Sequence, residues 1–250
     1  MDKDEAFLKA RFIELAEQSY QRNIPVHTDF LNLYEQNLFY SIVSELPPVC
    51  YELMGGYNLS ERKCVVFSPS EFGKVAPVYK LLRISPLDHR FTEDLTHRDF
   101  LGAVMGLGIK REQLGDLVLS EDSAYLFCFP SLAEFITEEL SSVKHTPVSC
   151  EEIAVEDFKF EPRMEEIQCS VSSVRLDAIL SQGFHISRNH AIPYIEEGKV
   201  FVNGRLITTN AYGLKEGDLI SVRGLGKLQY NGTLGNSKKG RLIVSLFLYT

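Results

Sequence analysis

The stretch 174–223 constrains the fold more strongly than any other part of this chain. Residues 176–180 place leucine and isoleucine side chains on one face, which predicts a short amphipathic helix. A second helix follows, with Ser187 as its N-cap and Gly198 at the left-handed position beyond its end. Asn203-Gly204 comes after alternating valines and is the strongest short indication of a hairpin turn. The pattern therefore predicts two short helices followed by a β-hairpin.

Charge is distributed unevenly along the 250 residues. The formal net charge is −8, but the segment from Ser170 to Thr250 holds ten Lys and Arg against five Asp and Glu, a net charge of +5. The segment from Met1 to Cys169 then carries 16 basic and 29 acidic residues, a net charge of −13. A chain polarised in this way can direct its basic end to phosphate. Its acidic end stays available for a protein partner.

Arg188 is the residue that we expect to contact RNA most directly. It follows Ser187 at the start of the second predicted helix, where unbonded backbone N–H groups and the positive end of the helix dipole favour an anion. Its planar guanidinium can hold a phosphate through two hydrogen bonds or stack on a base. One basic surface is expected to extend around it, formed by Arg175, His190, Lys199, Arg205, Arg223 and Lys227. The full set of predicted RNA-binding residues is Arg188, Arg175, Ser187, His190, Lys199, Arg205, Arg223, Lys227, Lys238, Lys239 and Arg241.

Short motifs in the C-terminal third resemble the alpha-L (S4-type) RNA-binding module over about residues 171–230. That module occurs in a small-subunit ribosomal protein, in tyrosyl-tRNA synthetases and in pseudouridine synthases. The motifs are Arg-Leu-Asp at 175–177, Ser-Arg at 187–188, Gly-x-Val-x-Val-Asn-Gly at 198–204 and Gly-Asp-x-Ile-x-Val-Arg at 217–223. Nearly the whole chain resembles the bacterial YlmH family, through Gly-Gly-Tyr at 55–57, Thr-His-Arg-Asp-Phe-Leu-Gly at 96–102, Leu-Gly-Ile-Lys-Arg at 107–111 and Lys-Lys-Gly-Arg at 238–241.

The resemblance to this family implies a ribosomal partner. Its members are implicated in ribosome quality control, where the S4-type module engages a large subunit that still carries peptidyl-tRNA. Ribosomal RNA and tRNA on the large ribosomal subunit are therefore the expected partners, and Arg188 takes the place of the family's RNA-contacting arginine. Pro193 departs from the pattern, because a proline inside the second helix removes an internal hydrogen bond.

Residues 1–75 predict an N-terminal helical and hairpin segment. Apolar side chains at three- and four-residue spacing indicate a helix from Lys3 to about Arg22. Thr28 is the expected N-cap of a second helix. Two apolar runs then flank Gly55-Gly56 and predict a hairpin.

Residues 76–166 predict a ferredoxin-like middle domain, because helices and strands follow the order β-α-β-β-α-β. Its strands lack the aromatic-rich motif with which RNA-recognition domains stack bases. The acidic stretch from Glu151 to Glu166 is the expected linker to a domain at 170–250, which closes with a strand from Leu242 to Leu248. The expected fold class is thus α+β, with a helical N-terminus, a ferredoxin-like middle and an S4-like C-terminal domain.

Motifs of enzymes and metal sites are incomplete in this sequence. His97-Arg98-Asp99 imitates a kinase catalytic loop, but Val104 stands where that loop needs asparagine. We expect Asp94 or Thr96 to cap a helix there instead. The six histidines and five cysteines show no metal-ligand spacing, and no glycine-rich phosphate loop is present. We therefore expect no catalytic residue, no metal and no cofactor.

The expected location is the cytoplasm, without a membrane partner. No apolar run reaches the length of a membrane-spanning helix, and the first five residues open acidic rather than basic. Two alternatives to a purely RNA-binding role stay open. One is an RNA-modifying enzyme with its active site in the middle domain, around His97 and Asp99. The other is an interaction adaptor linked to cell division.

Overall fold

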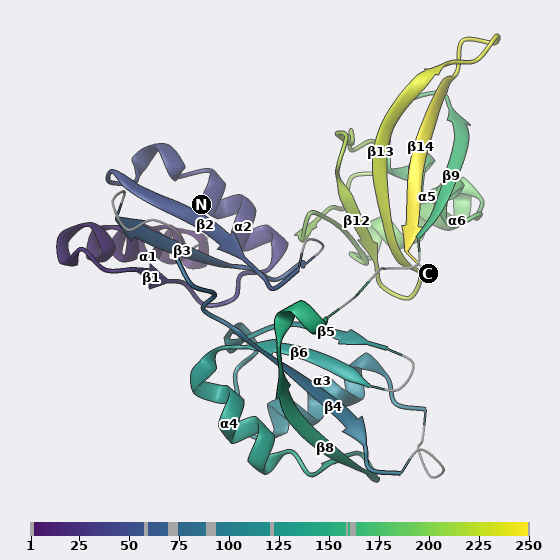
Figure 1. The fold of residues 1–250 in the computed structure, drawn as a ribbon. Helices are drawn as coiled ribbons and strands as arrows, with labels where there is room; N and C mark the ends of the chain where they lie inside the picture. Colours follow the sequence, from purple (N-terminus) through teal and green to yellow (C-terminus); the bar gives the residue numbers. More distant parts are fainter. Residues whose placement is uncertain are drawn as a thin grey trace. The chain divides into compact units, whose positions relative to one another are not determined.

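The computed structural model describes residues 3–57, 60–69, 75–88, 94–120, 123–158, 160 and 164–249. Contacts along the chain define two compact units, Met1–Lys159 and Phe160–Thr250 (Figure 1). Both units combine helices with antiparallel sheets, which confirms the predicted α+β class.

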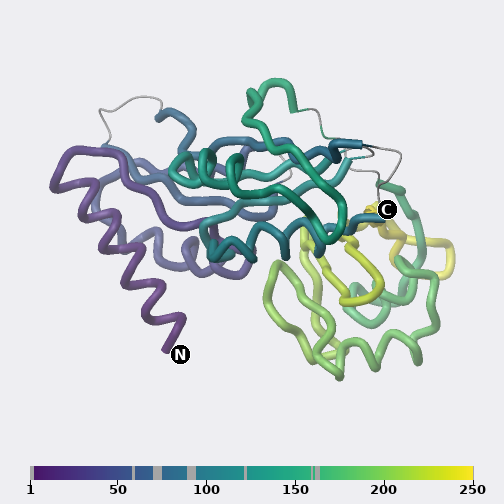
Figure 2. Tube along the Cα trace, turned by 90° about the horizontal axis from the view of Figure 1, so that it is seen from below, coloured from purple at the N-terminus to yellow at the C-terminus, as the bar shows by residue number. Residues whose placement is uncertain are grey.

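The first part of the N-terminal unit is a three-stranded sheet covered by helices. Figure 2 shows α1 as the long purple helix that begins at the N-terminus. Phe12, Phe39 and Phe67 are fully buried between the helices and the sheet, and the rings of Phe12 and Phe39 meet edge-on at 5.5 Å. The elements are α1 Lys3–Arg22, β1 Val26–His27, α2 Leu33–Tyr40, β2 Val49–Met54 and β3 Cys64–Pro69, with strand order β1-β3-β2. The predicted first helix and hairpin are confirmed.

Helix α2 is capped by Asn32 and not by Thr28, so the predicted start of this helix was wrong. The Asn32 side-chain oxygen accepts a hydrogen bond from the backbone N–H of Glu35 at 3.0 Å, and the Glu35 carboxylate accepts one from the backbone N–H of Asn32 at 2.7 Å. The Thr28 hydroxyl instead accepts a hydrogen bond from the backbone N–H of Val65 at 2.9 Å. This contact with β3 engages Thr28, and the helix begins four residues later, at the Asn32 cap.

The second part of the N-terminal unit is a ferredoxin-like sandwich. Its elements are β4 Lys80–Pro86, α3 His97–Gly106, β5 Leu114–Leu119, β6 Ala124–Cys128, α4 Pro130–Glu139, β7 Ser142–Val143 and β8 Thr146–Ile153. The strand order β5-β6-β4-β8-β7 places β4 in the middle of the sheet, as the ferredoxin-like topology requires. Leu82, Leu126 and Ile136 are fully buried between the sheet and its helices. The predicted order of elements is confirmed, and the short strand β7 is an addition.

Aromatic side chains of the same unit cover the other face of this sheet. Phe127 on β6 is fully buried, Tyr57 stacks on it with ring centroids 5.6 Å apart, and Phe158 meets it edge-on at 5.4 Å. A Cβ atom at Gly56 would lie 2.1 Å from the Phe127 ring, so this position needs glycine. RNA-recognition domains stack bases on the equivalent face. Here the protein's own rings occupy it.

A buried carboxylate joins the two parts of the N-terminal unit. Asp116 on β5 accepts hydrogen bonds from the Tyr57 hydroxyl at 2.9 Å and from the backbone N–H groups of Glu61 at 2.7 Å and Arg62 at 3.0 Å. The Arg62 guanidinium donates in turn to the backbone carbonyl of Leu114 at 3.0 Å. Burial lowers the pKa of Arg62 below its ordinary value. These bonds hold the segment after β2 against the edge strand of the second sheet.

The C-terminal unit is a six-stranded antiparallel sheet with two helices. Its elements are β9 Met164–Val171, α5 Leu176–Gly183, α6 Arg188–Glu196, β10 Val200–Val202, β11 Arg205–Leu206, β12 Leu219–Val222, β13 Gly226–Asn236 and β14 Leu242–Tyr249. The strand order is β11-β10-β12-β13-β14-β9. Ile179, Ile195 and Leu228 are fully buried in its core. Asn203 and Gly204 form the predicted turn with φ of 48° and 76°.

Strand β9 lies partly inside the stretch that was expected to be a linker. It pairs with β14 along its whole length, from Met164 opposite Tyr249 to Val171 opposite Leu242. Strand β8 also extends into that stretch, as far as Ile153. The predicted linker from 151 to 166 is therefore wrong at both ends, and the C-terminal unit begins before residue 170. Acidic side chains on exposed strand positions resemble a linker in composition, and this caused the error.

Candidate RNA-binding site

The start of α6 offers the site expected for an anion. The Ser187 hydroxyl accepts a hydrogen bond from the backbone N–H of His190 at 3.2 Å, which confirms Ser187 as the N-cap. Arg188, Asn189 and His190 form the exposed first turn. Because the first N–H groups of a helix lack an intrahelical acceptor, this turn presents donors and the positive end of the helix dipole beside the Arg188 side chain.

The part of the sheet next to α6 carries four of the predicted cations. Val200 and Val222 pair with each other and are buried, so the alternating residues point to the outer face. Lys199 and Arg223 lie at the ends of these two strands, where the Arg223 N–H donates to the Lys199 carbonyl at 2.9 Å. Lys227 lies on the next strand, opposite Ser221, which in turn pairs with Phe201. Arg205 is exposed on the outermost strand, β11.

Two aromatic rings lie among these cations, which the sequence did not indicate. The Arg223 guanidinium carbon lies 5.0 Å from the centre of the Phe201 ring, and Lys199 Nζ lies 5.6 Å from the centre of the Tyr194 ring. His190 stacks on Tyr194 with ring centroids 6.0 Å apart. Aromatic platforms therefore accompany the cations of the C-terminal unit. We call these five residues the aromatic–cation surface.

Arg175 is engaged in a local ion pair. Its guanidinium donates to both carboxylate oxygens of Asp177, at 3.1 Å and 3.2 Å, and the Asp177 side chain is only 6% exposed. A buried carboxylate needs such a partner, so Arg175 stabilises the start of α5.

The remaining three cations lie at the tip of the β13–β14 hairpin, at the end opposite the C-terminus (Figure 1). Lys227 pairs with Tyr249 at the base, whereas Asn236 pairs with Leu242 beside the tip. Nine residues of strand separate the two ends, a distance of about 30 Å at 3.3 Å per residue. The hairpin tip therefore lies apart from the basic surface predicted around Arg188, whose members are Arg175, His190, Lys199, Arg205, Arg223 and Lys227. The residues that the structure places at the tip are Lys238, Lys239 and Arg241.

The motif His97-Arg98-Asp99 forms the first turn of α3. Thr96 is the N-cap, and the Asp99 carboxylate accepts hydrogen bonds from the Thr96 N–H at 2.8 Å and its hydroxyl at 2.6 Å. Lys144 forms an ion pair with the same carboxylate at 2.8 Å. The hydrogen bonds from Lys144 and Thr96 lower the pKa of Asp99 to about 2. Asp99 thus has a structural role at the helix terminus.

We expect Asp99→Asn to make the stability of the N-terminal unit depend less on pH between pH 2 and pH 5. The folded-state pKa of Asp99 is depressed from 3.8 to about 2, so its stabilising effect is present above pH 4 and is lost as the pH falls towards 2. Thermal unfolding followed by circular dichroism between pH 2 and pH 5 measures this loss. Lys144→Gln should remove part of the same dependence. Identical pH profiles for wild type and Asp99→Asn would contradict the assignment.

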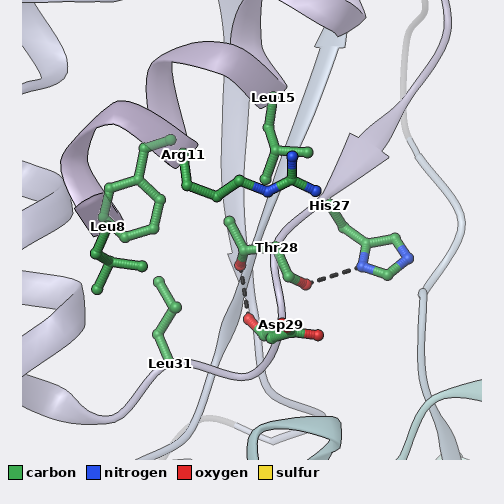
Figure 3. Close-up of a pocket in the computed structure, with 8 residues that line it drawn as sticks. Leu8, Arg11, Leu15, His27, Thr28, Asp29 and Leu31 are labelled. Atoms are coloured by element: carbon green, nitrogen blue, oxygen red, sulfur yellow. Dashed lines mark hydrogen bonds between the residues drawn. The ribbon is translucent and has the colours of Figure 1, made fainter. Parts of the chain in front are cut away.

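A small cavity lies between α1 and the chain after β1 (Figure 3). It measures about 120 Å³ and is lined by Leu8, Arg11, Phe12, Leu15, His27, Thr28, Asp29 and Leu31. Burial, followed by the charge of Glu112, raises the pKa of Asp29. Pockets for drug-sized ligands measure about 300–1,000 Å³, so this cavity holds only a small group.

The described residues contain no group of three or more His, Cys, Asp or Glu side chains placed to hold a metal ion. None of the helices in the described ranges is long and apolar enough to cross a membrane.

Helices α5 and α6 pack with an antiparallel sheet, and Arg188 lies at the N-terminus of α6. These features define an RNA-binding protein with an S4 domain. Residues 174–220 match the family model "S4 domain", and residues 80–157 match the model "Putative RNA-binding domain in YlmH". The chain is 31% identical over 218 residues to "Ribosome-associated protein quality control protein P2" of Bacillus subtilis, an alignment that covers 86% of this chain and 83% of that protein. The chain belongs to the YlmH family.

Two further proteins are similar to parts of the chain. An "Uncharacterized RNA pseudouridine synthase" of Aquifex aeolicus is 43% identical over 51 residues, which are 20% of this chain and 21% of that protein. The solved structure "Cell division protein ylmH from Streptococcus pneumoniae" has a TM-score of 0.51 and 22% identity, and covers 64% of this chain and 97% of its own. At 22% identity, the similarity to the Streptococcus pneumoniae structure supports only the assignment of the fold.

Proposed function

We propose that this chain is a non-catalytic, cytoplasmic RNA-binding protein that contacts ribosomal RNA and tRNA on stalled large ribosomal subunits carrying peptidyl-tRNA. The position of Arg188, in the exposed first turn of α6 directly after the Ser187 cap, is the observation that carries this proposal. A phosphate at this place meets backbone donors, the helix dipole and a bidentate guanidinium together. The name of the Bacillus subtilis relative supports the ribosomal setting.

The predicted site residues take different parts in this proposal. The main contact comprises Arg188 and its neighbours Ser187, His190, Lys199, Arg205, Arg223 and Lys227. Arg175 supports the fold at the start of α5 through Asp177. The hairpin-tip residues Lys238, Lys239 and Arg241 form a second contact to the same RNA, about 30 Å from the first by the strand rise. A single folded RNA that spans this distance would bind the main contact around Arg188 and the hairpin tip at the same time.

The N-terminal unit takes a protein partner in this proposal. Residues 1–159 hold 15 basic and 26 acidic residues, a net charge of −11, whereas residues 160–250 hold 11 basic and eight acidic residues, a net charge of +3. Phosphate repels an acidic unit, and the aromatic face of its sheet is already covered by Tyr57 and Phe158. The deep RNA contact therefore belongs to the C-terminal unit.

Sedimentation of a cell extract through a sucrose gradient tests the proposal. The tagged wild-type protein should peak with free large subunits and recover tRNA. Arg188→Ala should move to the top of the gradient, because the loss of the anchoring guanidinium weakens the phosphate contact. Arg22→Ala is the matched control and should still peak with large subunits, since Arg22 lies at the exposed end of α1, outside both matched domains.

Two results would overturn this reading. Wild type that peaks with small subunits, or that stays unbound at the top, contradicts a large-subunit role and favours the adaptor alternative. New modified bases in ribosomal RNA after incubation with the protein and cofactor mixtures would instead identify an RNA-modifying enzyme. An unchanged modification map together with large-subunit sedimentation supports the proposal.

A further inference from the structure

The aromatic–cation surface combines two kinds of group that phosphate binding alone does not need. His190, Tyr194 and Phe201 are partly or fully exposed although they are aromatic, and they occupy the same region as Lys199 and Arg223. The cations are sufficient to attract phosphate, and the rings are not needed for it. Exposed rings beside cations are instead typical of proteins that stack nucleic-acid bases.

Backbone hydrogen bonds hold this surface in one geometry. The Lys199 N–H donates to the Tyr194 carbonyl at 2.9 Å, and the Arg223 N–H donates to the Lys199 carbonyl at 2.9 Å. These two bonds connect the end of α6 to β10 and then to the residue that follows β12. Ile195 and Val200, which adjoin Tyr194 and Lys199 in the chain, are fully buried in the core of the unit. The backbone positions that carry the rings are therefore fixed, and the Tyr194 ring also packs against the core of the unit. The surface needs less ordering when it binds.

The cations above the rings are able to exchange their partners. Lys199 forms an ion pair with Glu197 at 2.6 Å, but both side chains are about half exposed, at 45% and 57%. An ion pair this exposed contributes little, so phosphate can compete for Lys199. Arg223 is exposed above the Phe201 ring, and a planar guanidinium can stack on a ring with one face and on a base with the other.

We propose that the aromatic–cation surface holds an unstacked base of the bound RNA. The protein then prefers RNA in which a bulged or looped nucleotide interrupts a helix, and Arg188 holds a phosphate of the adjoining strand. A fully paired helix keeps its bases stacked internally and offers this surface only phosphate and ribose. This inference rests on the proposed function, because it names the class of RNA that the same site selects.

Two RNA hairpins that differ by one nucleotide test the inference with the full-length protein. One contains a single bulged 2-aminopurine, and in the other an added nucleotide on the opposite strand pairs with it. The bulged RNA should bind about tenfold more tightly, in line with the usual worth of one base–aromatic stack, and its 2-aminopurine fluorescence should be quenched on binding. Phe201→Leu keeps an apolar side chain but removes the ring, so it should abolish the preference and leave affinity for the paired RNA unchanged. Phe201→Tyr should retain the preference.

The possible results separate this inference from the proposed function. Wild type that binds both hairpins equally overturns the base-stacking inference and leaves the proposed function intact. Wild type that binds neither hairpin overturns the proposed function. Phe201→Leu that weakens both hairpins equally shows that the ring only supports Arg223, which also overturns the inference. Circular dichroism establishes that each variant is folded, and Tyr194→Leu replaces Phe201→Leu in the same comparison if the latter is not.

Discussion

Asp116→Ala should lower the free energy of unfolding of the N-terminal unit by about 3 kcal/mol. The Asp116 carboxylate is only 8% exposed and accepts hydrogen bonds from the Tyr57 hydroxyl and from the backbone N–H groups of Glu61 and Arg62. Alanine leaves all three donors without this acceptor, and each buried unpaired donor costs about 1–3 kcal/mol. The expected loss of unfolding free energy is near the lower end of the sum for three donors, because Glu61 and Arg62 are partly exposed and water can reach them.

Urea unfolding followed by far-ultraviolet circular dichroism measures this effect, since the chain contains no tryptophan for fluorescence. Tyr57→Phe is the matched control. It removes one of the three donors while the ring can keep its stack on Phe127, so it should cost about 1 kcal/mol. If Asp116→Ala costs no more than Tyr57→Phe, Asp116 is not the acceptor that joins the two parts of this unit.

Features that depend on neighbouring residues could be predicted from the sequence. Ser187 caps α6 because its hydroxyl reaches an N–H group three residues later, and no distant contact within the described ranges competes for it. Asn203-Gly204 turns because both residues tolerate a positive φ. The ferredoxin-like order also followed from the period of apolar residues in each element. In all these cases the deciding interactions lie within one turn, helix or strand.

Features that depend on distant pairing could not be predicted in the same way. Thr28 has the chemistry of a cap, but Val65 on another strand engages its hydroxyl. Strand β9 is acidic, and only its pairing with β14, which begins at Leu242, identifies it as a strand. The aromatic–cation surface needs Lys199 and Arg223 side by side, 24 residues apart in sequence. The separation of the hairpin tip from Lys227 likewise follows from the length over which β13 and β14 pair.

Arg188→Ala should weaken RNA binding by about 1.5–3 kcal/mol, or about 10- to 150-fold in Kd, without unfolding the protein. The side chain is exposed, so its removal leaves no cavity and no unpaired buried group. Its loss removes a charge-assisted contact to phosphate at the N-terminus of α6, while the Ser187 cap and the helix remain. Arg188→Lys should recover only part of the affinity, because an ammonium group cannot reproduce the planar bidentate contact.

Fluorescence anisotropy with a ribosomal RNA fragment, repeated at several salt concentrations, measures both the affinity and its electrostatic part. With about five phosphate contacts, the slope of log Kobs against log salt for the wild type should be about −3.5 to −4.5. Arg188→Ala should make this slope less negative by about 0.7–0.9, the share of one phosphate contact. Arg22→Ala removes the same charge from an exposed position in the other unit and should change neither quantity. An equal effect of both substitutions would mean that only net charge matters, and a slope near zero for the wild type would exclude a phosphate-based site at α6.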